Sequence, residues 1–301
     1  MAPPNGTAVD VPDGRAIFAP GAQSTSVNVI QNTNIENIEF TPGTEAYKIH
    51  LPKYLKLIGN GIINNSEKIQ EFYAESKNGG IYFWKKSIAG MVAPGTKNIR
   101  IYNRHFGETH FDDRSNAASS KIINRKKGAL ILGIIPLIFG GRSSAGSSEL
   151  INSGRKSEIH FYAWSDGNKA TIRNMKGSIY FDWSYKKPFS IRRIANSRNM
   201  IVGRTKVRVS DTLTLKRKSK LNIELAADKG NGKLIVINEA TIDGQLFVTG
   251  HRKLETGQYV LISSHRKISG KFRKATFTGF KPAQKQSLIY TPKEVILKVR
   301  K

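Results

Sequence analysis

The sequence predicts an all-β fold, a right-handed parallel β-helix (solenoid) built from degenerate rungs of 20–28 residues. Two columns of residues recur at that period through the middle of the chain, and turns of small residues separate the segments around them. Hydrophobic residues make up 39% of the 301 residues, which is enough for a packed core. Frequent Gly and β-branched residues oppose helices. The repeat is therefore expected to consist of strands and turns.

The first column is a phenylalanine preceded by alternating apolar residues. Its spacings are 28, 28, 22 and 20 residues, and its members are Phe83, Phe111, Phe139, Phe161 and Phe181. The period-2 alternation places each Phe and the residue two before it on one face of a strand. For Phe139 this strand falls in the apolar stretch 129–139. The column is expected to fill the interior of the solenoid.

The second column is an asparagine that closes an Ile-x-Asn or Leu-x-Asn motif. Its members, 21, 28, 22 and 22 residues apart, are Asn103, Asn124, Asn152, Asn174 and Asn196. Asn tolerates turns, and stacked Asn side chains can hydrogen-bond along a solenoid, so a structural role is expected for them. One unit cannot bury its apolar face alone, whereas stacked units bury a continuous core.

Charge divides the chain more sharply than hydrophobicity does. The 49 Lys and Arg exceed the 22 Asp and Glu, which gives a net charge of +27. We expect an irregular N-terminal segment over 1–24, near-neutral opening coils over 25–80, strongly basic rungs over 81–200, and C-terminal coils with capping strands over 201–301. A shift of this size is typical of an interaction surface.

Several classes of protein are disfavoured by composition. The chain has no Cys and only six scattered His, so it offers no zinc-thiolate, iron–sulfur or His-ligand spacing. We expect no metal and no cofactor. The first 18 residues lack the features of a signal peptide, and 129–139 is too short for a transmembrane helix.

The repeats resemble the passenger domains of bacterial autotransporters, the type V secretion family, whose degenerate rungs read G-x-I-x-F, a short turn, then S-A-G-x-x-x-I-x-N. Residues 144–152 (SAGSSELIN) and 166–174 (DGNKATIRN) carry this pattern. Opening coils such as 35–40 (IENIEF) and closing segments such as 240–244 (ATIDG) follow in the family's order. The resemblance covers roughly 25–301.

The resemblance implies a β-helical rod at the cell surface or secreted, associated with the outer membrane where a translocator barrel is attached. The sequence departs from the family in two respects. We expect none of these 301 residues to form the family's translocator barrel, and Lys and Arg stand where passengers usually carry neutral polar residues. The rod is expected to be a monomer.

A row of cations is the strongest functional feature of the sequence. One or more Lys or Arg follow each Asn of the second column closely, namely Arg104, Arg125, Lys126, Lys127, Arg155, Lys156, Lys176 and Arg198. Stacked rungs would place them about 5 Å apart along one edge, where their repulsion favours an anionic partner. We predict binding of an anionic glycan, lipopolysaccharide or another polyanion. No motif for sequence-specific nucleic-acid recognition accompanies the row.

Two other functions stay open. A polysaccharide-active β-helix enzyme would need clustered carboxylates, yet Asp112 and Asp182 are separated by rungs that offer Gly140 and Tyr162 at that place. We therefore expect a non-enzymatic, adhesive protein. An inert stalk is the third possibility. The outward column of Tyr82, His110, His160 and Tyr180, with Trp84 beside it, is suited either to stacking on sugar rings or to stabilising the sheet.

Overall fold

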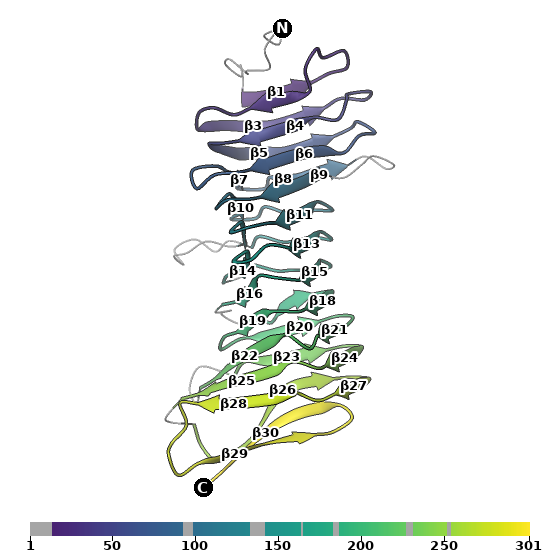
Figure 1. Cartoon of the computed structure of the whole chain (residues 1–301). Helices are drawn as coiled ribbons and strands as arrows, with labels where there is room; N and C mark the ends of the chain where they lie inside the picture. Colours follow the sequence, from purple (N-terminus) through teal and green to yellow (C-terminus); the bar gives the residue numbers. More distant parts are fainter. Residues whose placement is uncertain are drawn as a thin grey trace.

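A computed structural model confirms the all-β parallel solenoid (Figure 1). It describes residues 14–92, 99–132, 142–163, 165–182, 187–226, 231–251 and 254–301. The chain winds through about ten turns with rungs about 24 residues long. The first described strand, β1 (Arg15–Phe18), and the C-terminus lie at opposite ends of the rod. The right-handed sense of the winding stays a prediction.

Sheet B contains the phenylalanine column and runs the length of the rod. Its strands are β1 (Arg15–Phe18), β3 (Thr33–Phe40), β5 (Tyr54–Asn64), β7 (Gly80–Phe83), β10 (Glu108–Phe111), β12 (Ala129–Leu132), β14 (Glu158–Phe161), β16 (Ser178–Phe181), β19 (Asn199–Val202), β22 (Lys220–Leu225), β25 (Gln245–Gly250) and β28 (Lys274–Thr278), with β8 (Ile88–Val92) also paired to β5. Every pairing in this sheet is parallel. The solenoid begins inside the segment expected to be irregular, since β1 pairs with β3.

Sheet A contains the asparagine column. Its strands, in spatial order, are β2 (Ser26–Asn28), β4 (Lys48–Leu51), β6 (Gln70–Ala74), β9 (Ile99–Asn103), β11 (Lys121–Asn124), β13 (Glu149–Asn152), β15 (Thr171–Asn174), β18 (Arg193–Asn196), β21 (Leu213–Leu215), β24 (Glu239–Ile242) and β27 (Lys267–Gly270). Each rung of the middle region passes from a strand of sheet A through a short turn into a strand of sheet B.

Sheet C covers the third side of the C-terminal rungs. It consists of β17 (Phe189–Ile191), β20 (Lys206–Val209), β23 (Lys233–Val236), β26 (Gly257–Ser264), β30 (Glu294–Arg300) and β29 (Lys285–Tyr290). The pairings from β17 to β26 are parallel. The pairings of β26 with β30 and of β30 with β29 are antiparallel. This antiparallel end lies at the C-terminal tip of the rod (Figure 1).

The interior phenylalanine column is confirmed with one correction. Phe83 pairs with Phe111 and Phe161 with Phe181, and the ring centroids are 4.7 and 5.1 Å apart. Leu132, not Phe139, stands between the two pairs. Phe139 lies outside the described residues.

The cause of this error is that the stretch 129–139 (ALILGIIPLIF) is apolar at almost every position instead of alternating. Two phases of the pattern therefore fit the column equally well, one ending at Leu132 and one at Phe139. Only stacking against Phe111 and Phe161 fixes the register, so the strand ends at Leu132. The remaining residues of the apolar stretch consequently follow the strand in the sequence and do not belong to it.

Small turns complete the middle rungs. Asn116, Ser144 and Asp166, which open the turns expected from the sequence, lie in register through isolated parallel bridges. The described residues contain no α-helix. None of these residues therefore forms a helix long and apolar enough to cross a membrane.

Candidate functional site

All eight predicted cations lie in the turns that lead from sheet A to sheet B. We call this edge of the rod the A–B corner. Its turns are 104–107, 125–128, 153–157, 175–177 and 197–198. Arg104 and Lys127 are half-buried, and the other six cations are exposed. The structure therefore brings the predicted residues together along one edge of five successive rungs.

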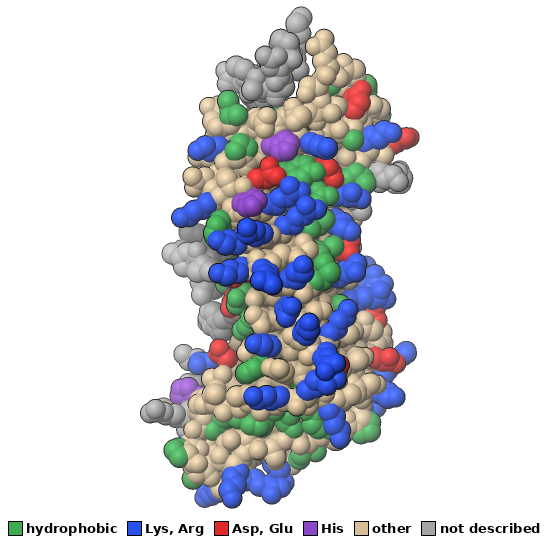
Figure 2. All heavy atoms as spheres, in the orientation of Figure 1, with side chains coloured by type: hydrophobic (Ala, Val, Ile, Leu, Met, Phe, Trp, Pro, Cys, Tyr) green, Lys and Arg blue, Asp and Glu red, His purple; other side chains and the backbone are tan. Residues whose placement is uncertain are grey.

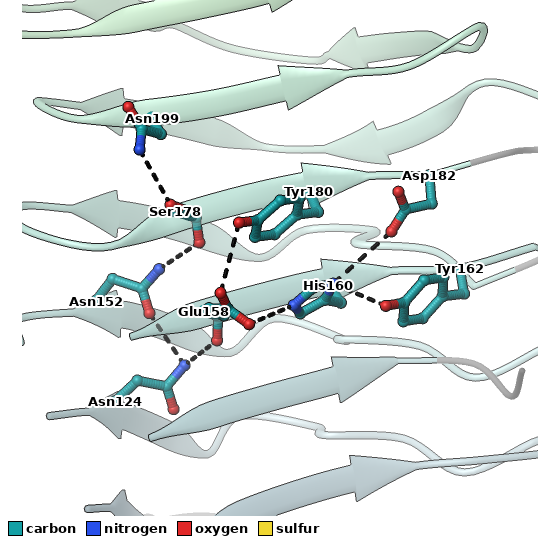
Figure 3. Close-up of polar contacts among 9 residues, drawn as sticks. All are labelled: Asn124, Asn152, Glu158, His160, Tyr162, Ser178, Tyr180, Asp182 and Asn199. Atoms are coloured by element: carbon teal, nitrogen blue, oxygen red, sulfur yellow. Dashed lines mark hydrogen bonds and ion pairs between the residues drawn. The ribbon is translucent and has the colours of Figure 1, made fainter. Parts of the chain in front are cut away.

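The asparagine ladder holds this corner in place from inside. All five Asn are buried and in register. The Nδ2 of Asn103 donates to Oδ1 of Asn124 at 2.9 Å, and Nδ2 of Asn124 donates to Oδ1 of Asn152 at 3.0 Å. The Nδ2 of the first four also donates across the corner to a strand of sheet B, as from Asn124 to the Glu158 carbonyl at 2.7 Å, while Nδ2 of Asn196 donates to the Arg198 carbonyl within its turn. Figure 3 shows the contacts of Asn124 and Asn152. Buried amides bonded in this way fix where each turn begins.

The corner turns themselves are tight. Lys127 and Lys156 adopt left-handed backbone conformations, with φ of 60° and 59°. A Cβ at Gly128 would lie 2.2 Å from the Asn103 carbonyl oxygen, so only glycine allows this approach. The amide of Lys127 donates to the Arg155 carbonyl of the next turn at 3.2 Å. Backbone bonds thus link neighbouring cationic turns directly.

Most of the corner charge is not neutralised within the described residues. There, Arg104 is the one cation of the eight with a carboxylate within 4.0 Å, that of Glu75 at 3.2 Å. Arg125 lies over the Tyr102 ring at 5.2 Å from its centroid. Lys127 lies over the Phe106 ring at 4.3 Å. These aromatic contacts orient the cations without removing their charge.

The wider surface is basic as well. Figure 2 shows Lys and Arg side chains following one another along most of the length of the visible face, with few Asp and Glu among them. A continuous field of one sign extends further from the surface than isolated charges do. The A–B corner is therefore part of a larger basic surface.

A second cluster lies on the outer face of sheet B around His160 (Figure 3). Its Nε2 is 3.0 Å from Oε2 of Glu158, and its Nδ1 is 2.9 Å from the Tyr162 hydroxyl. Asp182 Oδ2 lies 3.7 Å from the same Nδ1. The ring stacks on Tyr180 with 4.4 Å between centroids. The imidazole is thus enclosed by acceptors and aromatic rings.

The electrostatics of this cluster favour a charged imidazole. Burial by itself lowers the pKa of His160, but its contacts with Asp182 and Glu158 outweigh burial and raise that pKa above the usual value. Burial, together with the same two carboxylates, raises the pKa of Tyr162 to about 12. The cluster therefore holds one cation between two carboxylates, so the charge of the imidazolium is balanced within the cluster.

A related cluster occurs around His110, two rungs nearer the N-terminus. His110 Nε2 is 2.9 Å from Glu108, and its ring stacks on Tyr82 with centroids 4.2 Å apart. The outward column expected from the sequence is therefore stacked in two pairs, Tyr82 with His110 and Tyr180 with His160, while Ile131 separates the two histidines.

The structure does not bring Asp112 and Asp182 together, because β12 and β14 separate their strands. Asp112 and Asp182 follow their strands at equivalent places, and Tyr162 takes that place in the rung before Asp182. Gly140, expected there in the remaining rung, lies outside the described residues. Burial raises the pKa of Asp112 to about 6. Among the described residues no group of three His, Asp or Glu could hold a metal ion.

Sequence reasoning missed two features of these faces. The segments 108–112 (ETHFD) and 158–162 (EIHFY) share a Glu-x-His motif before the same interior Phe, and this repeat was visible in the sequence. On sheet A, the rings of Tyr73 and Tyr102 stack with centroids 4.9 Å apart, and both hydroxyls donate to Glu71. The cluster of Tyr73, Tyr102 and Glu71 joins residues of two rungs, and the irregular rung length concealed their alignment in the sequence.

Comparison with known proteins adds no assignment: no protein-family model matches the chain, and a search of the curated proteins gives no match. The geometry of the corner and of the sheet B face is therefore the basis for any functional argument.

Proposed function

We propose that this chain is a non-enzymatic binding rod that attaches to polyanions through the A–B corner. The observation that carries the proposal is the stacking of cationic turns in five successive rungs, with one carboxylate partner among the eight cations in the described part of the chain. Like charges held this close are unfavourable alone and are stabilised by an anionic polymer. Anionic glycans, lipopolysaccharide and other polyanions are the partners that we propose.

The resemblance to autotransporter passengers supports the same proposal. We propose that the rod belongs to the cell surface or the secreted fraction and works as a monomer, displaying the corner along its length. The degenerate rungs and the order of the closing segments are the basis for this placement.

The test is affinity for immobilised heparin and for lipopolysaccharide as a function of salt. Arg125, Lys126, Lys127, Arg155 and Lys156 are replaced by Ser. The native chain is expected to bind with an affinity that falls steeply with salt, and the variant is expected to lose about tenfold or more at low salt.

A matched control removes the same charge elsewhere. Five exposed lysines of the C-terminal region, Lys267, Lys274, Lys281, Lys285 and Lys293, are replaced by Ser. If the corner is the site, this control keeps most of the affinity. Equal loss in both variants would show that net charge alone is responsible, and unchanged affinity of the corner variant would refute the proposal.

A further inference from the structure

A hollow on the outer face of sheet B lies apart from the A–B corner. It measures about 400 Å³ and is lined by Asn32, Asn34, Tyr54, Lys56, Tyr82, Trp84 and Asp112. Such a volume is in the range of about 300–1,000 Å³ typical of small-molecule sites. The lining combines three aromatic rings, two amides, one ammonium and one carboxylate.

Two files of residues from successive rungs build the hollow. Asn34, Lys56 and Tyr82 are register partners on β3, β5 and β7. Trp84 and Asp112 follow β7 and β10, and their amides donate to carbonyls of the preceding rung at 2.9 Å each. Each of these five residues lies on a strand of sheet B or directly after one. The distances between them are therefore fixed by the stacking of the rungs.

The aromatic rings are held while part of their surface stays open. Trp84 keeps 39% of its surface exposed although it is a large apolar side chain. The Lys56 ammonium lies 3.2 Å from the centroid of its ring. Tyr54 and Tyr82 pack edge to face with centroids 5.1 Å apart, and the Tyr54 hydroxyl donates to the Lys77 carbonyl at 3.1 Å. The rings are therefore oriented before any ligand arrives.

The polar groups of the hollow have capacity left. Asn32 accepts one bond through Oδ1, from the Tyr54 amide at 3.1 Å, while its Nδ2 has no partner among the described residues. The Asn34 side chain likewise has no hydrogen-bond partner within the described part of the chain. Asp112 has no cation within 4.0 Å among the described residues, and the rise of its pKa to about 6 leaves it ionised above that pH.

We infer that this hollow binds a pyranose ring of a neutral saccharide. A sugar ring presents an apolar C–H face that packs on aromatic rings, and hydroxyls that both donate and accept. Amides, an ammonium and a carboxylate can all bond to hydroxyls. A ligand with net charge of either sign would meet either Asp112 or Lys56 as a like charge, so the pair favours a neutral ligand.

The test is binding to an array of neutral hexasaccharides, namely those of cellulose, starch, xylan, mannan and chitin, with oligogalacturonate as the acidic comparison. The buffer contains about 0.5 M NaCl, which shortens the Debye length to a few ångström and suppresses binding by the corner. At least one neutral hexasaccharide is expected to bind. Trp84→Ala should weaken that binding at least tenfold, and Asp112→Asn should weaken it less.

Matched variants separate this site from the rest of the molecule. Phe106→Ala removes an exposed aromatic ring of the A–B corner and should leave sugar binding unchanged. The five-residue corner variant should also keep it, whereas Trp84→Ala should keep heparin binding. The inference would be overturned if the native chain bound no neutral hexasaccharide, or if the native chain and Trp84→Ala bound equally well. Neither result would affect the proposed function.

Discussion

The middle rungs and the C-terminal rungs fill the same solenoid in two different ways. In the middle, Phe rings stack beneath sheet B and Asn amides form a ladder at the end of sheet A. In the C-terminal region Asn196 is followed in register by Leu215 and Ile242, and Phe181 by Val202. Both columns thus change from a specific stack to aliphatic packing within one rung of each other.

The third side of the rung changes along the rod as well. In the middle rungs it carries small buried residues such as Ser115 and Ala117, next to the isolated bridges. In the C-terminal rungs sheet C supplies larger ones, such as Val207 and Leu234. The stacked pair Phe83 and Phe111 thus lies in rungs whose third side carries small residues. At the boundary, Phe189 of β17 packs from the third side against Phe161 and Phe181, with centroids 6.1 and 5.8 Å apart.

The largest expected effect is the loss of a stacked ring. Phe161→Ala removes a fully buried side chain between Leu132 and Phe181, and should lower the free energy of unfolding by about 3–5 kcal/mol. Val248→Ala, in the C-terminal region, should cost about 2 kcal/mol because fewer atoms are lost. Urea denaturation followed by circular dichroism measures both. Equal losses would contradict the proposed difference between the two regions.

A smaller effect is expected for the ladder. Asn124→Leu leaves the Glu158 carbonyl and the Asn152 Oδ1 without the amide that donates to them, and should cost about 2–4 kcal/mol. The same measurement applies. The reciprocal change, Leu215→Asn, buries an amide opposite Ile242 and should also destabilise, by about 1–3 kcal/mol. If Leu215→Asn stabilised the chain, the asparagine ladder could be extended into the C-terminal rungs, and the two regions would not differ in the packing that they require.

The smallest effect concerns pH. Because the pKa of His160 is raised in the fold, the folded chain holds the proton more tightly than the unfolded chain does. This stabilisation is fully present below the unfolded value of about 6.5 and is lost as pH rises through the folded pKa. His160→Asn should therefore be less stable than the native chain at low pH, and this difference should shrink as pH rises.

A pH series of urea unfolding curves measures this difference. His105→Asn serves as the control, since His105 is exposed in a corner turn and belongs to no such cluster. A difference between native chain and His160→Asn that stays constant across the series would argue against the charged imidazole.

The functional residues were predicted to different degrees. The eight cations could be found because each follows an Asn whose spacing the sequence displays. The hollow around Trp84 was visible only in part, as an outward column beside a tryptophan. Asn32, Asn34 and Lys56 reach it from earlier rungs, and no local pattern connects residues that far apart in the chain.

By itself the sequence determined the fold class, the asparagine column and four of the five phenylalanines. Period-2 alternation and a recurring side chain can be recognised in the sequence even where the length of the rungs varies. Only the tertiary structure decided the phase of the stretch 129–139, where Leu132 takes the place expected for Phe139. The physical reason is that a parallel strand gains its register from the strands above and below it. An apolar segment with two equivalent phases contains no information about those neighbours.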